Sequence, residues 1–499
     1  MELLSPAGNI EKLSYCYTYG ADAAYIGLKK FSLRVKADNF YEDEYKKIIE
    51  LKKKFPTKKL HCALNISFHN AEIDSFISEI PYFKQYPIDA FIVQDLGIVP
   101  LLQKNFPDAA LHLSTQASCM NREAVKMYRS LGFKRVVMGR EASLAEIAEI
   151  KSAVPDMEIE CFVHGAMCIA YSGRCLMSAY LNGRSAQSGF CSHTCRWEYD
   201  VLAEKKQTEK NEADILYSPQ SRALAESGSL VLREHKRPEE YFPIYEGDNF
   251  TAVLSSKDLC MVDHLAEFKK AGVDSLKIEG RMKSVYYVAL VTRAYRKALD
   301  ALDNKISVSE AKPFVNELYE ASHRAYGTGF YFGREDADVT VTGASDSPYQ
   351  LVATIGPSLS AAQTNAVFTL AAELEKTRAQ KYNSLCEPAK KAFDKAVLEH
   401  PDKNLSVVQP HDGWKFFSIK PLNMIDQHTK LELVTPNIVS LKMESAQYQL
   451  VNPETGEVYR WVCDDHPCVL YTCLPLVDGG MLRAKDLEFI SGKIRDTGR

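Results

Sequence analysis

The stretch Leu131-Gly-Phe-Lys-Arg-Val-Val-Met-Gly-Arg-Glu141 contains the pattern that decides the fold. It follows an amphipathic helical stretch and begins near a glycine, which suits the left-handed residue that often closes a helix. A short apolar run comes next and ends in polar residues. The stretch therefore predicts the end of a helix followed by a buried strand with a polar carboxyl end.

The same pattern recurs from Met1 to about Arg281. Amphipathic helices that alternate with short apolar strands indicate parallel strand-helix-strand units. The candidate strands lie in residues 2–5, 19–27, 60–65, 86–95, 111–116, 131–141, 159–164 and 271–280. Because a closed (β/α)8 barrel requires eight strands, we predict an α/β fold with a TIM-like barrel. A doubly wound open sheet is the alternative, but no glycine-rich phosphate turn follows the first strand.

In a barrel of this kind, the residues at the carboxyl ends of the strands face the active site. These positions are unusually polar here, although turns that only face solvent also carry polar residues. The predicted row at the barrel mouth is Asn65, Gln94, Asp95, Gln116, Arg140, Glu141, His164, Lys277, Glu279 and Arg281.

The chain is expected to have three parts. Residues 1–300 form the barrel, residues 301–400 a helical extension, and residues 401–499 a small all-β domain with short alternating runs between turn signals. Residues 204–245 interrupt the barrel pattern with a Lys- and Glu-rich start and three prolines, which predicts an exposed insertion. The sequence indicates no role for this insertion.

Composition is that of an ordinary soluble globular protein, with 46% hydrophobic and 25% charged residues among 499. No apolar run is long enough for a membrane span, and the N-terminus lacks a secretory signal pattern. We therefore expect a cytoplasmic protein without a membrane partner. The net charge of -4 gives no overall attraction to nucleic acid, so an RNA partner would need a local basic patch.

The cysteines are the most informative residues. Thirteen cysteines in a reducing compartment are expected to be core residues, metal ligands or nucleophiles rather than disulfides. Cys168, Cys175, Cys191 and Cys195 lie within one short segment, without the paired Cys-x-x-Cys knuckles of a zinc ribbon. Thiolate groups of this kind bind zinc or an iron-sulfur cluster, and the uneven spacing favours the cluster. Cys260, predicted at the start of the helix leading into the eighth strand, could meet them because strands seven and eight are neighbours.

Other interpretations of the cysteines stay open. One thiol could be a nucleophile with His164 or His193 as its base, and some thiols could be buried core groups. Cys463, Cys468 and Cys473 match no metal spacing and are predicted to be structural. Gly-x-Ser-x-Gly and His-Glu-x-x-His motifs are missing from the sequence, which disfavours serine-hydrolase and zincin chemistry.

Basic residues are predicted near the mouth, after the second and eighth strands. Guanidinium groups there would suit a carboxylate or phosphate ligand, whereas lysines in such positions also occur on solvated faces. Interleaved aromatic residues are compatible with stacking on RNA bases or with core packing. The basic residues are Lys29, Lys30, Arg34, Lys36, Lys277, Arg281 and Lys283.

Residues 160–178 resemble the hallmark of peptidase family U32, the collagenase-like peptidases. That hallmark is Glu-x-Phe-x-x-Gly-Ala-x-Cys, four residues, then Gly-x-Cys-x-x-Ser, and this chain matches it without a gap. Similar phrases extend the resemblance over about residues 1–335, at 4–8, 31–40, 114–116, 191–197, 256–259 and 276–284. Residues 277–287 and 322–331, with the terminal β domain, are most similar to the tRNA 5-hydroxyuridine branch of the family.

The resemblance implies an enzyme that hydroxylates the wobble uridine of tRNA without oxygen. It implies prephenate, a dicarboxylate, as the hydroxyl donor, and leaves room for a family-related partner protein. It also implies a 4Fe-4S cluster on Cys168, Cys175, Cys191 and Cys260, with Cys195 as the rival for the third place. Catalytic residues are not implied. The residues expected to bind substrate are Arg34, Asn39, Gln94, Gln116, Arg140, His164, Lys277, Glu279 and Arg281.

The family also leaves other functions open. Its name implies a peptidase, which would need a metal or one activated thiol and would tolerate loss of the remaining cysteines. Other members are implicated in the hydroxylation of ribosomal RNA or of ubiquinone precursors. A non-catalytic RNA-binding protein would keep the basic mouth but would not need Cys260. Among these functions, we expect tRNA hydroxylation.

Overall fold

The chain divides into two compact units, Met1–Asp346 and Ser347–Arg499, and each is described here by itself. The computed structural model describes residues 1–28, 30–33, 37–168, 170–182, 184–191, 195, 202–203, 214–215, 231–233, 241–243, 245–247, 250–252, 256–333, 347–399, 405–426 and 428–485.

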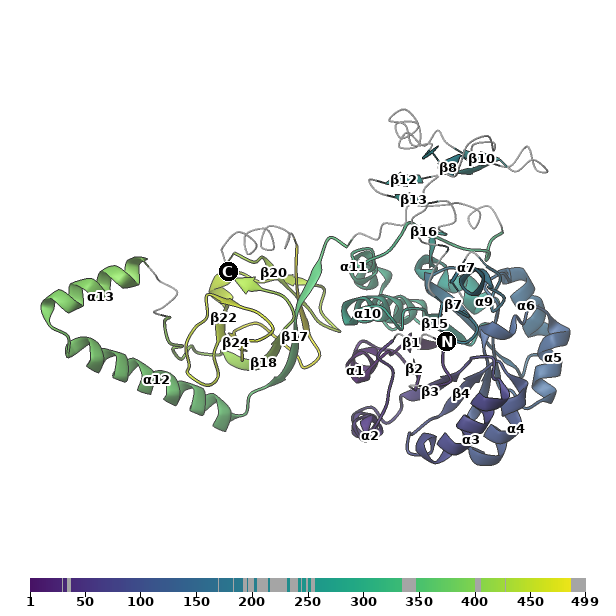
Figure 1. The fold of residues 1–499 in the computed structure, drawn as a ribbon, viewed down its shortest axis with the longest axis horizontal. Helices are drawn as coiled ribbons and strands as arrows, with labels where there is room; N and C mark the ends of the chain where they lie inside the picture. Colours follow the sequence, from purple (N-terminus) through teal and green to yellow (C-terminus); the bar gives the residue numbers. More distant parts are fainter. Residues whose placement is uncertain are drawn as a thin grey trace. The chain divides into compact units, whose positions relative to one another are not determined.

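The first unit is built around a closed barrel of eight parallel strands (Figure 1). The barrel closes because the last strand pairs with both the first strand and the seventh. All eight predicted strands are confirmed, and so is the TIM-like barrel. The strands are β1 (Glu2–Pro6), β2 (Ala23–Ile26), β3 (Lys59–Leu64), β4 (Ala90–Val93), β5 (Ala110–Leu113), β6 (Arg135–Val137), β7 (Glu158–Ala166) and β15 (Ser275–Ile278).

Helices cover the outside of the barrel, as Figure 1 shows for α1 to α6. Several begin at a side-chain cap: Asn9, Asn121 and Ser143 each accept a hydrogen bond from the backbone of the first helical turn. The helices are α1 (Ile10–Thr18), α2 (Glu44–Lys54), α3 (Asn70–Phe83), α4 (Val99–Asn105), α5 (Arg122–Ser130), α6 (Leu144–Ala153), α7 (Met177–Asn182), α9 (Leu265–Lys270), α10 (Val285–Leu302) and α11 (Val308–Leu318). Among the described helices, none is both long and apolar enough to cross a membrane.

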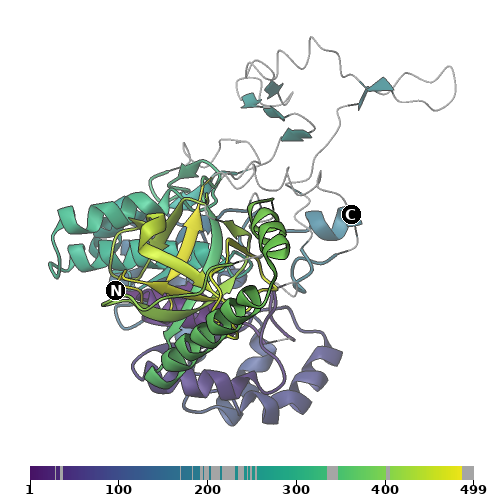
Figure 2. The same ribbon diagram turned by 90° about the vertical axis from the view of Figure 1, so that its left-hand side faces the viewer.

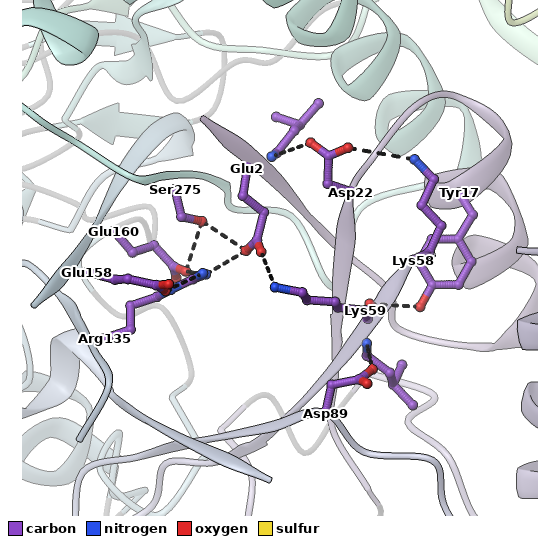
Figure 3. A network of polar contacts seen from close by, with 12 residues as sticks. Glu2, Tyr17, Asp22, Lys58, Lys59, Asp89, Arg135, Glu158, Glu160 and Ser275 are labelled. Atoms are coloured by element: carbon purple, nitrogen blue, oxygen red, sulfur yellow. Dashed lines mark hydrogen bonds and ion pairs between the residues drawn. The ribbon is translucent and has the colours of Figure 1, made fainter. Parts of the chain in front are cut away.

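Charged side chains fill the amino-terminal end of the barrel (Figure 3). The buried guanidinium of Arg135 donates to the carboxylates of Glu2, Glu158 and Glu160. Ser275 adds a hydroxyl hydrogen bond of 3.1 Å to Glu160. Because every buried charge here meets an opposite charge, the polar interior is compatible with a stable core.

Strand β7 contains a bulge that changes where its side chains point. Lys277 of β15 is the register partner of Phe162, and the next residue, Ile278, is the partner of His164. Val163 is therefore an extra residue in β7. A bulge reverses the alternation of side chains along a strand, so residues after Val163 face the opposite side from the one that simple alternation predicts.

A short strand, β14 (Asp258–Cys260), pairs antiparallel with the last three residues of β7, and β16 (Tyr326–Gly327) pairs with β14. The prediction that Cys260 begins a helix was wrong: it ends β14, and a turn of 3-10 helix (Val262–His264) follows. Three strand pairs of the predicted insertion region are described, β8 (Leu202–Ala203) with β9 (Asp214–Ile215), β10 (Val231–Arg233) with β11 (Tyr241–Pro243), and β12 (Tyr245–Gly247) with β13 (Phe250–Ala252). Most of residues 204–245 lie outside the described residues.

The second unit contains an antiparallel sheet of seven strands, in the order β21-β20-β25-β17-β18-β24-β22. The strands are β17 (Gln350–Ser358), β18 (Lys415–Pro421), β20 (Leu431–Val434), β21 (Leu441–Lys442), β22 (Tyr448–Val451), β24 (Val469–Thr472) and β25 (Met481–Ala484), and the short strands β19 (Ile425–Asp426) and β23 (Trp461–Val462) form a separate pair. The antiparallel C-terminal domain was predicted, but its sheet begins earlier than residue 401, because β17 pairs with both β18 and β25.

Two helices, α12 (Ala361–Asn383) and α13 (Glu387–Glu399), connect β17 to β18. Val367 and Ala371 of α12 are buried against Phe416, Val451 and Tyr471 of the sheet. Figures 1 and 2 show α12, in green, lying along this sheet. The region predicted as a helical extension is thus shared between the two units: α11 belongs to the first, and α12 and α13 to the second.

Candidate active site at the barrel mouth

A cavity of about 270 Å³ lies at the carboxyl ends of the barrel strands. Its wall combines residues that follow several strands with residues of the cysteine-rich segment, so that segments distant in sequence share one space. The polar and charged lining residues are Tyr25, Asn65, Ser114, Thr115, Gln116, Arg140, Glu141, Tyr171, Ser172, Gln187, Lys277, Glu279, Arg281 and Lys283. Of the nine residues predicted to bind substrate, five line this cavity, namely Gln116, Arg140, Lys277, Glu279 and Arg281.

Lys277 projects from β15 and links the cavity to the charged interior of the barrel. Its ammonium lies 2.8 Å from Glu160 Oε1, 4.7 Å from the centroid of the Tyr25 ring and 5.5 Å from that of Phe162. Burial alone would raise the pKa of the Glu160 carboxyl, but Lys277 and Arg135 hold that pKa well below its ordinary value. The Glu160 carboxyl therefore stays ionised beneath the cavity.

Arg140 follows β6 and presents a cation to the cavity. Its guanidinium carbon lies 4.0 Å from the centroid of the Phe162 ring, which is a cation-π contact. The Nε atom is buried and has no hydrogen-bond partner among the described residues. A guanidinium placed over an aromatic ring, with a buried donor not used by the described residues, is suited to an anionic ligand.

Arg281 is buried beside β2, where it donates a hydrogen bond of 2.7 Å to Ser32. A Cβ atom on Gly27 would lie 2.4 Å from the Arg281 guanidinium, so glycine leaves the space that this side chain occupies. Glu279 accepts a longer hydrogen bond of 3.4 Å from the Tyr25 hydroxyl. The mouth thus carries both signs of charge.

Two of the other predicted substrate residues lie away from the cavity. Gln94 bonds to Ser67 at an exposed position, and buried Asn39 donates to the carbonyl of Ala37. Neither residue lines the cavity. Arg34, like Lys29, Lys36 and His193, lies outside the described residues.

His164 also lies away from the cavity, because the bulge at Val163 turns its side chain outward. Its ring nitrogens lie 3.4 Å from the Tyr295 hydroxyl and 3.3 Å from the Tyr326 hydroxyl. Burial lowers the pKa of His164 to about 3, so the imidazole is neutral near pH 7. No histidine of the described residues lines the cavity.

Four of the candidate cysteines, Cys168, Cys175, Cys191 and Cys195, line the same cavity. Cys260 does not: it ends β14, whose backbone pairs with the end of β7, and burial raises the pKa of its thiol to about 11. Thiolates are the usual ligands of iron-sulfur clusters, so the donor chemistry of this wall fits the expected group. Among the described residues, however, no group of three or more His, Cys, Asp or Glu side chains is placed to hold a metal ion.

The loop between Cys168 and Cys175 is held tightly against the barrel. Ser172 donates both its backbone N–H and its hydroxyl to Glu141. The following residue, Gly173, has φ +76°, and a Cβ atom there would lie 2.0 Å from the carbonyl oxygen of Gln116. Only glycine combines this backbone conformation with so close an approach.

Sequence reasoning missed several cavity residues. Tyr25 belongs to an apolar strand pattern, where a tyrosine is expected in the core. Ser172 lies inside the family motif but is not one of its fixed positions, and Gln187 lies in the following loop, where no periodic pattern applies. Gly173, the residue after Ser172, is the one local signal in the sequence that the backbone comes close to another segment there.

A parallel barrel with a charged cavity at its carboxyl face is the architecture of barrel enzymes. Residues 8–340 match Peptidase family U32, and the chain belongs to this family. The chain is 40% identical over 342 residues to tRNA hydroxylation protein P of Escherichia coli (strain K12), covering 66% of this chain and 74% of that protein. For tRNA hydroxylation protein P of Haemophilus influenzae the identity is 37% over 344 residues, covering 66% and 73%. A 23S rRNA 5-hydroxycytidine synthase of Escherichia coli is 32% identical over 355 residues, covering 70% of this chain and 47% of that protein.

Proposed function

We propose that this protein acts in tRNA modification, in the oxygen-independent hydroxylation of wobble uridine to 5-hydroxyuridine. The observation that carries the proposal is the cavity in which four cysteines, Arg140, Arg281 and Lys277 line one space at the mouth of a closed barrel. The similarity to tRNA hydroxylation proteins over two thirds of the chain supports it.

The proposed hydroxyl donor is a small dicarboxylate such as prephenate. The guanidinium of Arg140 lies over the Phe162 ring, and its buried Nε has no hydrogen-bond partner among the described residues, which supports a role as one carboxylate partner. Arg281 and the ion-paired Lys277 supply further positive charge on the same wall. Arg34 stays a proposed partner from the sequence alone.

A 4Fe-4S cluster is proposed as the cofactor. Cys168, Cys175, Cys191 and Cys260 would hold it, with Cys195 as the rival of Cys191 for the third place. Cys195 shares the cavity wall with the first three, whereas β14 brings Cys260 next to the strand from which the cysteine loop departs. When bound, the cluster would supply Lewis acidity or electron transfer at the cavity.

The tRNA is proposed to contact the rim of the cavity. Tyr171 and Met282 line the cavity and are exposed. Leu176 and Phe190 are also exposed, and each is next in sequence to a cysteine that lines the cavity. Exposed apolar and aromatic side chains beside Lys283 are suited to an unpaired base and its phosphates. A family-related partner protein acting alongside this chain is part of the same proposal.

The test is nucleoside analysis of tRNA from a strain that lacks this protein. We expect 5-hydroxyuridine to be lost, to return with the unaltered gene, and to stay missing with Cys168→Ala or Arg140→Ala. Iron and acid-labile sulfide should reach about four per chain in anaerobically purified protein. The iron content of Cys191→Ala and Cys195→Ala then identifies the third ligand, because only loss of a true ligand lowers the iron content, and Cys260→Ala tests the fourth. Unchanged tRNA in the deletion strain would overturn the proposal.

A second candidate is hydroxylation of ribosomal RNA, which the similarity to the 5-hydroxycytidine synthase favours. The same nucleoside analysis applied to rRNA separates the two. A cysteine peptidase gains no support from the described residues, because none of their histidines lines the cavity that holds the thiols.

A further inference from the structure

Ser172 is the central anchor of the loop that carries Cys168 and Cys175. Its backbone N–H lies 2.8 Å from Glu141 Oε1, and its hydroxyl donates to the same atom over 3.1 Å. The hydroxyl oxygen accepts the backbone N–H of Arg140, and the carbonyl oxygen accepts the hydroxyl of Ser118. Each polar group of Ser172 is therefore used, and two of its hydrogen bonds end on one carboxylate oxygen.

Glu141 is placed to connect this loop to the ligand cavity. It is the residue after Arg140 in the loop that follows β6, and both residues line the cavity. Its second oxygen, Oε2, is buried and has no hydrogen-bond partner among the described residues. Hydrogen bonds to a carboxylate are stronger than those between neutral groups, so Glu141 holds the loop more firmly than a neutral acceptor would.

We propose that Glu141 is a positioning residue that sets where Cys168 and Cys175 stand in the cavity wall, acting through Ser172. Its carboxylate fixes the middle of the loop, and the close contact of Gly173 with Gln116 fixes the adjoining residue. Both cysteines thereby stay on the wall that Arg140 also lines. The inference rests on the proposed function only for the identity of the group that the thiols hold.

The test measures the alkylation rate of each cysteine by mass spectrometry in reduced, metal-free, full-length protein. In Glu141→Ala we expect the half-buried thiol of Cys175 to react at least tenfold faster, because both hydrogen bonds from Ser172 are lost and even one such bond to a charged group is worth about a factor of ten. Cys168 is already exposed and serves as the reference for an accessible thiol. Buried Cys62 and Cys161 should stay protected. Glu141→Gln, which keeps one acceptor oxygen, should restore much of the protection. The matched control is Glu149→Gln, an exposed glutamate on α6, which should behave like the unaltered protein.

A second readout is the visible absorption of anaerobically reconstituted protein. We expect the cluster absorption to fall in Glu141→Ala and to recover in Glu141→Gln. If the variants have equal melting temperatures, a purely structural role of Glu141 would not produce this difference. If Glu141→Ala exposes all cysteines at once, it has unfolded. Ser172→Ala, which keeps the backbone bond to Glu141, must then accelerate the alkylation of Cys175 selectively.

Equal alkylation rates at Cys175 in folded Glu141→Ala and in the unaltered protein would overturn the inference, as would the lack of selectivity in Ser172→Ala. If Cys175 becomes selectively reactive but neither the variants nor the unaltered protein take up iron, the positioning role stands and the proposed cluster fails. The two failures are therefore distinguishable.

Discussion

Glu160 is the residue whose loss should cost the barrel most. It is fully buried and its two oxygens meet Lys277, Arg135 and Ser275. Glu160→Gln would leave two buried cations without this carboxylate, so we expect the free energy of unfolding to fall by about 3–5 kcal/mol. Glu158→Gln, which removes a half-exposed partner of the same Arg135, should cost about 1 kcal/mol or less. Urea unfolding of both variants checks the difference, and equal losses would contradict it.

His61 should make stability depend on pH. Burial lowers its pKa to about 4, and its ring packs 4.8 Å from that of His112 inside the barrel. The unfolded chain binds this proton below about pH 6.5 while the folded chain does not, so the free energy of unfolding should fall as pH drops from 6.5 towards 4, by about 1 kcal/mol per pH unit. His61→Gln should reduce the slope by this amount in urea titrations at several pH values, while the share of buried His164 and His112, whose pKa values burial also lowers, remains. His264→Gln, at a partly exposed position, should leave the slope unchanged. An unchanged slope in His61→Gln would refute the assignment.

The position of the loop between Cys168 and Cys175 depends on Gly173. Gly173→Ala would place a Cβ atom 2.0 Å from the Gln116 carbonyl, so the loop must move away from the barrel while the barrel itself stays folded. We expect faster alkylation of Cys175 and loss of iron uptake at nearly unchanged melting temperature. Gly413→Ala is the matched control: its φ of +74° is similar, but nothing lies within 4 Å of the added atom. Unchanged Cys175 alkylation and iron uptake in folded Gly173→Ala, or the same changes in Gly413→Ala, would contradict the prediction.

The elements were predictable because each strand of the barrel is a buried run flanked by a helix and a polar end. Local pattern therefore located all eight strands, and it placed Arg140 and Lys277 at the mouth. The bulge in β7 was not predictable, since it is set by the register between Lys277 and Ile278 of β15 and their partners. Alternation from Phe162 places His164 toward the barrel interior, but the extra residue Val163 turns it outward.

Contacts between residues far apart in the sequence also explain why the prediction for Cys260 failed and why Ser172 was missed. The local sequence predicts that Cys260 begins a helix. In the structure it ends strand β14, which pairs with β7, a strand nearly a hundred residues earlier in the sequence. Ser172 was missed because its importance comes from Glu141, which lies on another loop. Residue type and spacing thus located the chemistry of the mouth, whereas the contacts that position it depend on tertiary structure.

For the whole molecule, the placement of β17 decides where the second unit begins. Its sheet and its two clusters of buried residues, one containing Val352, Ile355 and Leu482 and the other Val367 and Phe416, form a core separate from the barrel. A fragment of residues 347–485 should therefore fold alone, with one cooperative thermal transition by circular dichroism. A fragment of residues 401–485, starting where the sequence predicted the domain, lacks β17, which pairs with both β18 and β25. Removing this strand unpairs two neighbours and opens the core, so the shorter fragment should show no cooperative transition. If the shorter fragment folded as well as the longer one, the strand order of the sheet would be wrong.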